Sequence, residues 1–367
     1  MKRKKLICLL LPAVLCSGCV QDAENTQKEL HSEVCMDCGF DTFFSLQQCY
    51  LSEDEFSSAF QEASEYFRYC NDLFDIYHDC PGMNNLKTVN DMAGKEPVSV
   101  EPEIIGMLKE AKEMYELSRG RMDITMGSLL SLWHECRTEA VDGIGAVPDP
   151  DAVQAAAAQR GWDSIVIDEA AGTVYIADPA VQLDAGAIAK GWAVEHTAQL
   201  LQSHGITTGA VNGGGNIRTL GAKQNGKPWR TGLQDPAGTG ALVTVTCLDE
   251  ESVATSGDYE RFFTGEDGQR YHHIIDPDTG YPAQYWHSVS IVTQRSDLAD
   301  ALSTALFTMT LEEGNALLQT MRQKYPGMEF EAVWITDPDA AYDTPCRMIV
   351  NNELVIYTEG LTERIEK

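Results

Sequence analysis

Residues 183–194 read LDAGAIAKGWAV, and they set two charged side chains, Asp184 and Lys190, among residues that are almost all small. Small side chains suit tight packing between segments, or they let the backbone approach a bulky anionic ligand that Lys190 also contacts. If both charges lay on one α-helix they would be about 120° apart and would not share a face. We therefore expect Asp184 to precede a helix as its N-cap, and the helix to continue to about His204.

The rest of the chain mixes helices and strands without a regular β-α-β alternation. Apolar residues recurring every three or four positions predict helices, and short apolar runs between turn residues predict strands. These patterns predict helices over residues 52–79, 103–118, 151–160, 297–308 and 311–324, and strands over residues 164–167, 173–176, 208–211, 216–220, 229–233, 241–248, 252–255, 271–275, 288–292, 332–336 and 348–351. The mixture predicts an α+β fold with a largely antiparallel or mixed sheet.

A glycine-rich run, VNGGGNIRTLG over residues 211–221, follows an apolar strand and invites comparison with a dinucleotide-binding turn. A Rossmann turn needs a third glycine three residues after the second, with a helix beyond it. Here Gly215 is followed by Asn216, Ile217 and Arg218 and then by strand-like sequence. We therefore expect a tight turn between two strands, with its backbone close to a ligand, and no Rossmann domain.

The N-terminus has the layout of an exported lipoprotein. A basic start at residues 2–5 precedes an apolar run over residues 6–15, and small residues stand just before Cys19. The apolar run is too short to span a bilayer, which needs about twenty residues. We predict that Cys19 is the lipidated first residue of the mature chain. An uncleaved signal anchor is the alternative, because Cys16 stands where such a motif usually has leucine.

The predicted organisation is a signal peptide over residues 1–18, a flexible acidic leader over residues 19–35 and one domain over residues 36–367. Loss of the signal peptide would leave 23 basic against 56 acidic residues, a formal charge of −33. Such a charge opposes binding to nucleic acids and to anionic headgroups. We therefore expect no nucleic-acid partner, and a membrane attachment through the lipid alone, on the periplasmic or extracellular face.

Eight cysteines would remain in the mature chain besides the lipidated Cys19, and an exported protein can pair them as disulfides. Cys35 and Cys38 form a CxxC pair, but a zinc site would need a second such pair or histidines at ligand spacing. The next cysteine, Cys49, has no CxxC partner. We interpret the cysteines as structural or idle thiols, with metal or redox chemistry as the alternative.

The stretch SDLADALSTALF, residues 296–307, predicts a helix start in which Asp300 and Thr304 share one face. One carboxylate with a hydroxyl and a backbone oxygen is a set that Mg²⁺ accepts when substrate phosphates and waters supply its other ligands. Plain capping and packing is the alternative. In HHIIDPDTGYPA, residues 272–283, we expect one of the two histidine rings to be buried and hydrogen-bonded.

The stretch SVATSGDYERFF, residues 252–263, places Thr255 and Ser256 where a strand ends in a turn. Its hydroxyl and N–H groups suit a ribose or phosphate, with Arg261 nearby, and they suit a self-contained turn equally well.

Six motifs in this order resemble the ApbE family of FAD:protein FMN transferases: RMDITMG, LDAGAIAKGWAV, VNGGGNIRTLG, VATSGDYERFF, HHIIDPDTGYP and ADALSTALF. The resemblance runs from about Phe40 to Phe307, and the lipidation motif at Cys19 adds to it. It implies an enzyme that binds FAD and Mg²⁺ and breaks the pyrophosphate. FMN would pass through a phosphoester to a threonine or serine hydroxyl of an acceptor flavoprotein, with release of AMP.

The resemblance also implies a set of site residues, position by position. The catalytic residues would be Asp300, Lys190 and His273. The contacts to the flavin nucleotide would be Phe40, Tyr77 near the end of the first predicted helix, Met122, Asp123, Asp184, Lys190 and Ile274. The magnesium ligands would be the carbonyl of Ala187 with Asp300 and Thr304.

One departure from the family lies near its start, where Phe40-Asp41-Thr42 replaces the usual Met-Gly-Thr, so that Phe40 would cover the flavin ring in place of methionine. Two alternative functions stay open. An FAD pyrophosphatase would use water in place of a protein hydroxyl and give FMN and AMP, and an exported FAD-binding lipoprotein would bind without turnover. In each enzyme a divalent ion and Lys190 would offset the pyrophosphate charge, which this acidic chain would otherwise repel.

Overall fold

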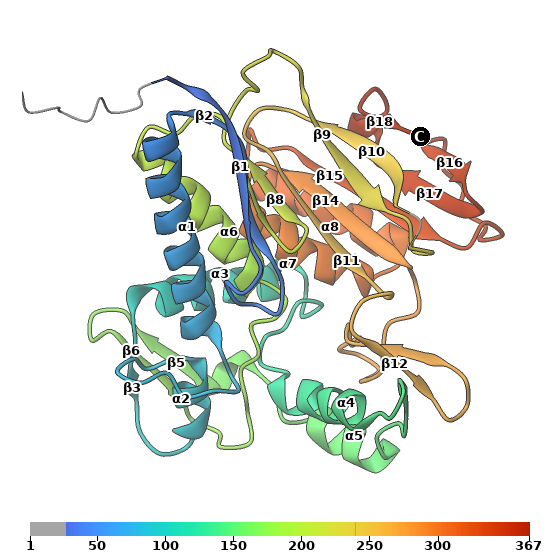
Figure 1. Ribbon diagram of the computed structural model, residues 1–367. Coiled ribbons are helices and arrows are strands. Elements are labelled where there is room, and N and C mark those ends of the chain that lie inside the picture. Colours follow the sequence, from blue (N-terminus) through green and yellow to red (C-terminus); the bar gives the residue numbers. More distant parts are fainter. Residues whose placement is uncertain (1–26, 239) are drawn as a thin grey trace, which may run out of the picture.

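The structure is a computed structural model that describes residues 27–238 and 240–367; the predicted signal peptide and lipidated Cys19 lie outside them. Its helices alternate irregularly with strands along the chain (Figure 1). The α-helices are α1 (Glu53–Phe74), α2 (Leu86–Asp91), α3 (Pro102–Leu117), α4 (Gly127–Glu139), α5 (Pro150–Ala157), α6 (Ala189–Ser203), α7 (Ser296–Phe307) and α8 (Leu311–Lys324), and the 3₁₀ turns are η1 (Trp162–Ser164) and η2 (Glu359–Leu361).

The main sheet has the strand order β1-β2-β7-β8-β11-β14-β15-β17-β16, and every neighbouring pair in it is antiparallel. Its strands are β1 (Glu29–Cys35), β2 (Phe44–Leu51), β7 (Ala210–Gly213), β8 (Asn216–Thr219), β11 (Ser252–Gly257), β14 (Ser288–Thr293), β15 (Phe330–Thr336), β16 (Arg347–Val350) and β17 (Glu353–Tyr357). The predicted α+β fold with a largely antiparallel sheet and no Rossmann unit is confirmed, and VNGGG forms the turn between β7 and β8.

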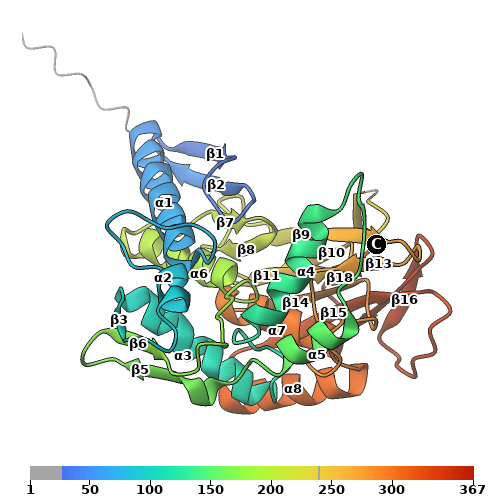
Figure 2. The same ribbon diagram turned by 90° about the horizontal axis from the view of Figure 1, so that it is seen from below.

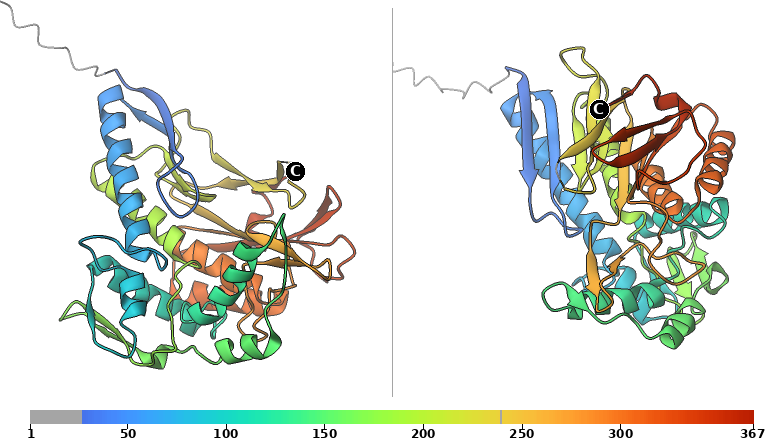
Figure 3. Two further views of the ribbon diagram at one scale, coloured as in Figure 1. Left: turned by 60° about the horizontal axis from the view of Figure 1, so that its bottom comes forward. Right: turned by 90° about the vertical axis from the view of Figure 1, so that its right-hand side faces the viewer.

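The main sheet is buried on both faces. Helices α1, α6 and α7 cover one face, and β9 (Trp229–Gln234) and β10 (Ala241–Cys247) cover the other (Figure 3). Strand β15 shows both sides: Phe330 and Trp334 pack under the helices, while Val333 and Ile335 pack under β9 and β10. Alternate residues of a strand point to opposite faces, so β15 reads as a continuous apolar run.

Three small sheets complete the fold, and a satellite core joins α4 and α5 to Phe263 and Ile275. Helices α4 and α5 lie at the bottom of Figure 1 and face the viewer in Figure 2. The small sheets are β18-β10-β9, β13-β12-β4 and β3-β6-β5, with β3 (Val98–Ser99), β4 (Ile144–Gly145), β5 (Ile165–Asp168), β6 (Thr173–Ile176), β12 (Phe262–Gly265), β13 (Arg270–His272) and β18 (Ile365–Glu366).

Two sequence predictions need correction. The helix expected to end at residue 79 stops at Phe74, because Asp75 adopts an extended backbone and its carboxylate accepts hydrogen bonds from the amides of Tyr77 and His78. The leader expected to be flexible through residue 35 includes β1, which pairs with β2. Polar residues hid this strand because β1 lies at the edge of the sheet and is mostly exposed.

Candidate active site

Helices α6 and α7 meet at the first group of predicted residues. The Asp300 carboxylate is only 4% exposed; it accepts from the Gly191 amide at 2.7 Å and contacts Lys190 Nζ at 3.3 Å. A Cβ atom on Gly191 would lie 2.4 Å from the Cβ of Asp300 and 2.5 Å from the carbonyl oxygen of Ser296, so only glycine fits there. The small residues of the 183–194 stretch thus serve close packing, and that packing fixes a carboxylate beside Lys190.

The Ala187 carbonyl lies at the start of α6 without a backbone partner. In a regular helix the Gly191 amide would donate to it, but that amide donates to Asp300 instead. Within the described residues no backbone amide donates to the Ala187 carbonyl oxygen. A carbonyl oxygen near a helix start that is released in this way is available to a ligand.

Thr304 follows Asp300 by one turn of α7, as predicted. Its hydroxyl lies 3.3 Å from the Ser256 hydroxyl, which in turn lies 2.8 Å from that of Ser303. Ser256 belongs to β11 and comes from the VATSG motif, so two motifs that are far apart in sequence meet here. We call the Ala187 carbonyl together with Lys190, Gly191, Asp300 and Thr304 the helix half of the site.

Asp184 and Asp123 lie on adjacent segments, because the Asp184 amide donates to the carbonyl of Ile124 at 2.8 Å. The Asp184 carboxylate accepts from the Gly186 amide at 2.8 Å, and burial raises its pKa. The prediction that Asp184 caps the helix is therefore wrong: α6 begins at Ala189, and the N-cap residue is Ile188. The loop between them is what leaves the Ala187 carbonyl outside the helix.

The MDIT motif is held rigidly next to Asp184. Met122 is fully buried, and the Asp123 carboxylate accepts from both the amide and the hydroxyl of Thr125, at 2.9 and 2.7 Å. Burial raises the pKa of Asp123 as well. With Asp184 close by, two carboxyl groups of raised pKa lie in neighbouring turns.

Tyr77 lies in the bend after α1, with half of its surface exposed, and its ring stacks on His134 of α4 with the centroids 5.0 Å apart. Burial and then the charge of Asp184 raise the pKa of Tyr77 to about 12. The Tyr77 hydroxyl stays protonated at neutral pH.

His273 follows β13, and its Nδ1 lies 3.2 Å from the carbonyl oxygen of Glu260. A carbonyl only accepts, so Nδ1 carries the proton and Nε2 keeps its lone pair. Burial and the charge of Arg261 lower the pKa of His273 to about 3, so the ring is neutral at pH 7. His273 is partly buried, and His272 is the more deeply buried ring of the pair, with Nε2 2.8 Å from the carbonyl oxygen of Ala283, as expected for one of the two.

Phe40 is joined to the same loop. Arg261 donates to the Phe40 carbonyl at 3.2 Å, and the Phe40 amide donates to Asn71 of α1 at 2.6 Å. Phe40 and Asp41 have positive φ angles of 56° and 52°. A glycine adopts this backbone without strain, and the family usually has glycine where this chain has Asp41. The departure from Met-Gly-Thr therefore places a non-glycine residue in a left-handed conformation. We call Phe40, Tyr77 and His273 the loop half of the site.

The sequence profile of the ApbE family matches residues 40–328. The chain belongs to the ApbE family. It is 39% identical over 259 residues to the FAD:protein FMN transferase of Treponema pallidum (strain Nichols), a match covering 66% of this chain and 69% of that protein. It is 31% identical over 287 residues to the FAD:protein FMN transferase of Klebsiella pneumoniae (strain 342), covering 75% and 84%.

Solved structures agree with this assignment. The ApbE protein of Thermotoga maritima superposes with a TM-score of 0.74 at 26% identity, over 92% of this chain and all of that one. The flavin transferase ApbE from Vibrio cholerae gives 0.73 at 25% identity, over 92% and 99%. The resemblance inferred from the six motifs is confirmed, and the curated ApbE relatives are named as flavin transferases.

The ApbE profile spans both halves of the site, whose individual roles stay predictions. Sequence reasoning missed two residues that hold them in place. The Asn90 side chain pairs with both the amide and the carbonyl of Leu183, at 2.8 and 2.9 Å, and so fixes the start of the 183–194 stretch. Arg121 contacts Asp276 at 3.2 Å and thereby ties the segment after His273 to the MDIT motif. In the sequence, the feature that could have pointed to Arg121 is its position directly before the MDIT motif.

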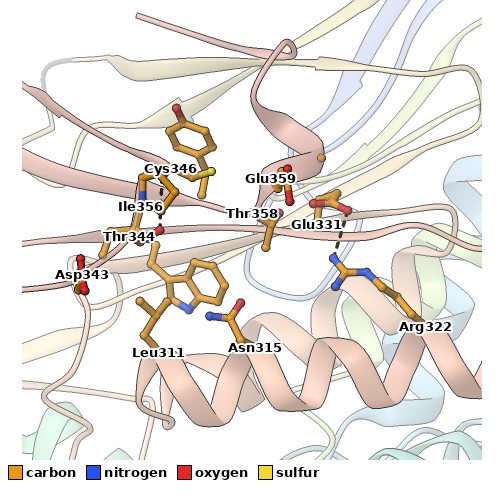
Figure 4. A pocket seen from close by; sticks show the side chains of 14 residues that line it. Leu311, Asn315, Arg322, Glu331, Asp343, Thr344, Cys346, Ile356, Thr358 and Glu359 are labelled. Atoms are coloured by element: carbon orange, nitrogen blue, oxygen red, sulfur yellow. Dashed lines mark hydrogen bonds and ion pairs between the residues drawn. The ribbon is translucent and has the colours of Figure 1, made fainter.

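Two other features lie apart from the site. A cavity of about 680 Å³ lies between α8, β15 and β17, where Arg322 reaches toward Glu331 (Figure 4), and no predicted site residue lines it. Glu29, His31 and Glu53 bring three ligand atoms within 4.8 Å of one another near the start of α1. Neither feature involves residues of the helix half or the loop half.

Proposed function

We propose that this chain is an FAD:protein FMN transferase that depends on magnesium and releases AMP. The observation that carries the proposal is the contact between α6 and α7. There the Asp300 carboxylate accepts a hydrogen bond from the Gly191 amide and contacts Lys190. The Ala187 carbonyl, which that amide would otherwise bond, is left free. A buried carboxylate, a free carbonyl and a phosphate-binding lysine at one point are the groups that a metal-assisted reaction of a pyrophosphate needs.

The oxygen groups of the helix half fit a hard divalent cation. Asp300, the Ala187 carbonyl and the Thr304 hydroxyl offer oxygen only, which Mg²⁺ prefers, and substrate phosphates and waters would complete its coordination. When bound, magnesium would offset the charge of the pyrophosphate and of the departing AMP. The ammonium of Lys190, which contacts Asp300 at 3.3 Å, would then be free to turn to a phosphate oxygen.

The transfer breaks one bond and forms another. The acceptor hydroxyl oxygen attacks the phosphorus of the FMN phosphate, the bond from that phosphorus to the AMP phosphate oxygen breaks, and the electron pair leaves with AMP. The hydroxyl proton needs a base, and the lone pair on Nε2 of neutral His273 suits that role. The pKa of about 3 makes this base weak in the free protein, so the negative charge of bound phosphates would strengthen it.

The acceptor distinguishes the proposal from its alternatives. The protein is incubated with FAD, magnesium and a domain that carries a target threonine, and the products are followed by mass spectrometry. We expect flavinylated acceptor and AMP in equal amounts. Free FMN with unmodified acceptor would instead support a pyrophosphatase, and intact FAD would support a protein that only binds it. A threonine-to-alanine acceptor is the matched control.

We also propose that the enzyme is attached to the membrane through lipid on Cys19, facing the periplasm or the exterior. The motif around Cys19 supports this, and in the described residues no helix is long and apolar enough to cross a membrane. In cells, Cys19→Ser is expected to move the protein from the membrane fraction to the aqueous one. If the variant stays in the membrane fraction, an uncleaved signal anchor is the better explanation.

A further inference from the structure

The disulfide between Cys35 and Cys38 closes the turn that leaves β1, and its two sulfur atoms have different surroundings. Cys38 is fully buried, whereas Cys35 is partly exposed. A thiol arriving from solvent can therefore reach the sulfur of Cys35 and not that of Cys38. This asymmetry matters because thiol–disulfide exchange depends on which sulfur is attacked and which one leaves.

The charges around the disulfide favour the same direction. The guanidinium of Arg68 lies 3.4 Å from Sγ of Cys38 and 3.9 Å from Sγ of Cys35. The carboxylate of Asp37 lies 3.5 Å from Sγ of Cys35. A cation stabilises a thiolate and an anion opposes it, so negative charge is better placed on Cys38 than on Cys35. Cys38 is thus the better leaving group.

We propose that Cys35 and Cys38 form a redox-active site that exchanges with an external dithiol. A thiolate of that dithiol attacks Sγ of Cys35, a mixed disulfide forms, and the bond to Cys38 breaks with its electron pair on the Cys38 sulfur. The second thiol of the reductant, as a thiolate, then attacks the reductant's first sulfur, which is bonded to Cys35 in the mixed disulfide. This closes the reductant's own disulfide and releases Cys35 as a thiolate. Each released thiolate takes up a proton unless Arg68 holds it charged. The protein gains two electrons, and the dithiol becomes a disulfide.

The site is coupled to the loop that carries Phe40. That loop joins β1 to β2, and Gly39, Phe40 and Asp41 in succession have positive φ angles. Such a backbone is strained at non-glycine residues and persists only where its surroundings impose it. Besides the disulfide, the loop is held by the contacts of Phe40 with Asn71 and Arg261. Reduction would remove a covalent restraint two residues from Phe40; this consequence rests on the proposed function, whereas the exchange itself does not.

The exchange is tested on the folded protein. Aliquots are treated with dithiothreitol, quenched with an alkylating agent and mapped by peptide mass. Wild-type protein is expected to open one disulfide without denaturant, with both Cys35 and Cys38 becoming alkylated, while buried Cys247 stays unmodified and reports that the fold is intact. In Cys38→Ser, oxidised glutathione is expected to form a stable mixed disulfide with Cys35; in Cys35→Ser, Cys38 should stay unreacted.

Arg68 provides the sharper measurement. Its guanidinium lies 3.4 Å from Sγ of Cys38 and would stabilise the thiolate that leaves, so removal of that charge is expected to slow cleavage by about threefold. Arg68→Gln is expected to show this loss, and Arg68→Lys to recover part of it. Equal cleavage rates in Arg68→Gln and wild-type protein, a glutathione adduct on Cys38 of the Cys35→Ser variant, or reduction only in denaturant would each overturn the proposal.

The coupling is tested by FAD binding without magnesium, so that turnover does not interfere. Reduced and oxidised proteins are titrated with FAD and followed by flavin fluorescence. Reduction is expected to weaken binding by roughly fivefold, as if the freed loop held its binding conformation about a fifth of the time. Equal affinities would overturn the coupling and leave the exchange site standing. Failure of the oxidised protein to bind FAD even after magnesium is added would count against the proposed function and not against the thiol chemistry.

Discussion

The two halves of the site are built by different means. In the helix half, Asp300 is buried between two packed helices, and Gly191 leaves no space for another side chain. In the loop half, Tyr77 is half exposed, and Phe40 takes a left-handed backbone held by two hydrogen bonds. Packed secondary structure fixes a side chain more firmly than loops do. The helix half is therefore already arranged for phosphate chemistry, whereas the loop half can adjust to its ligand.

Substitutions in the two halves are therefore expected to affect different properties of the enzyme. A substitution in the helix half changes a buried charge or a close contact, so it affects both turnover and stability. In the loop half, a substitution of Phe40 or Tyr77 removes a contact to the flavin, so it affects mainly affinity; His273, the proposed base, is the exception, because its loss would lower turnover. The predictions below test this separation.

The largest effect is expected for Asp300→Asn, which keeps the shape of the side chain and removes its charge. Loss of a group that stabilises transition-state charge lowers turnover by about 10²- to 10³-fold. We expect a loss of that size in FMN transfer, together with weaker dependence on magnesium, measured from initial rates over a magnesium titration. Thr304→Ala should act in the same direction and less strongly. Full turnover in both Asp300→Ala and Thr304→Ala would remove the metal assignment.

Asp297 is the matched control for Asp300, because it lies one turn earlier on α7 and is equally buried. It pairs with Arg295, which also contacts Glu110 at 2.6 Å, and burial together with the charge of Asp297 raises the pKa of Glu110 to about 8. Removing one partner of a buried pair costs about 3–5 kcal/mol. Asp297→Asn should therefore lower the free energy of unfolding and leave turnover per folded molecule close to wild type. A reversed pattern would show that the two aspartates were assigned the wrong way round.

Gly191→Ala is expected to damage the contact between α6 and α7 itself. The added methyl group would lie 2.4 Å from the Cβ of Asp300, and such overpacking costs about 1–3 kcal/mol. Urea unfolding should show the loss of stability, and initial rates should show that turnover falls with it. Gly106→Ala in α3 is the control: its methyl group would meet Trp192 at 3.8 Å, and alanine is the better helix former, so stability should hold or rise.

Sequence reasoning succeeded where local pattern and fold agree. Helix α7 and the turn between β7 and β8 follow from residue spacing, and the order of the motifs pointed to the family before any fold was known. The pairing of Asp300 with Gly191, over a hundred residues apart, does not follow from either motif alone. Only the close approach of α6 and α7 explains why position 191 is glycine.

The sequence failed where the outcome depends on distant partners. Strand β1 reads as a polar leader, because an edge strand with an exposed face lacks an apolar pattern; its identity comes from pairing with β2. The position of Asp184 before the small-residue stretch predicts a helix cap, yet its carboxylate accepts from the Gly186 amide and the helix begins later, at Ala189. In both segments the structure depends on hydrogen bonds that the local sequence pattern does not show: those of β1 to β2, and that of the Gly186 amide to Asp184.

Two histidines are expected to respond to pH in opposite ways. The pKa of His273 is lowered to about 3 by burial, so between pH 3 and 6.5 the unfolded chain binds a proton that the folded chain does not. Stability should then fall as pH drops through this range. The pKa of His287 is raised to about 9 by its bond to Asp258, so its contribution is complete below pH 6.5 and is lost as pH rises through 9.

Urea unfolding at a series of pH values tests both signs. His273→Gln should lose less stability than wild type between pH 6.5 and 4, and His287→Gln should be least stable relative to wild type at pH 6, with the gap closing by pH 10. Titration of His273 near pH 6.5 in an NMR spectrum would contradict the burial of this member of the loop half.

The smallest effect is expected at Tyr77, the most exposed part of the loop half. Its ring stacks on His134, and its hydroxyl stays protonated, so a ligand would use the ring face and not a phenolate. Tyr77→Phe should therefore bind FAD as wild type does, whereas Tyr77→Ala should lose about 1 kcal/mol of stacking, or about fivefold in affinity. Turnover at saturating FAD should be unchanged in both, as measured by fluorescence titration and initial rates. A fall in turnover like that of Asp300→Asn would mean that Tyr77 itself takes part in catalysis, and the assignment of Tyr77 to flavin affinity alone would be wrong.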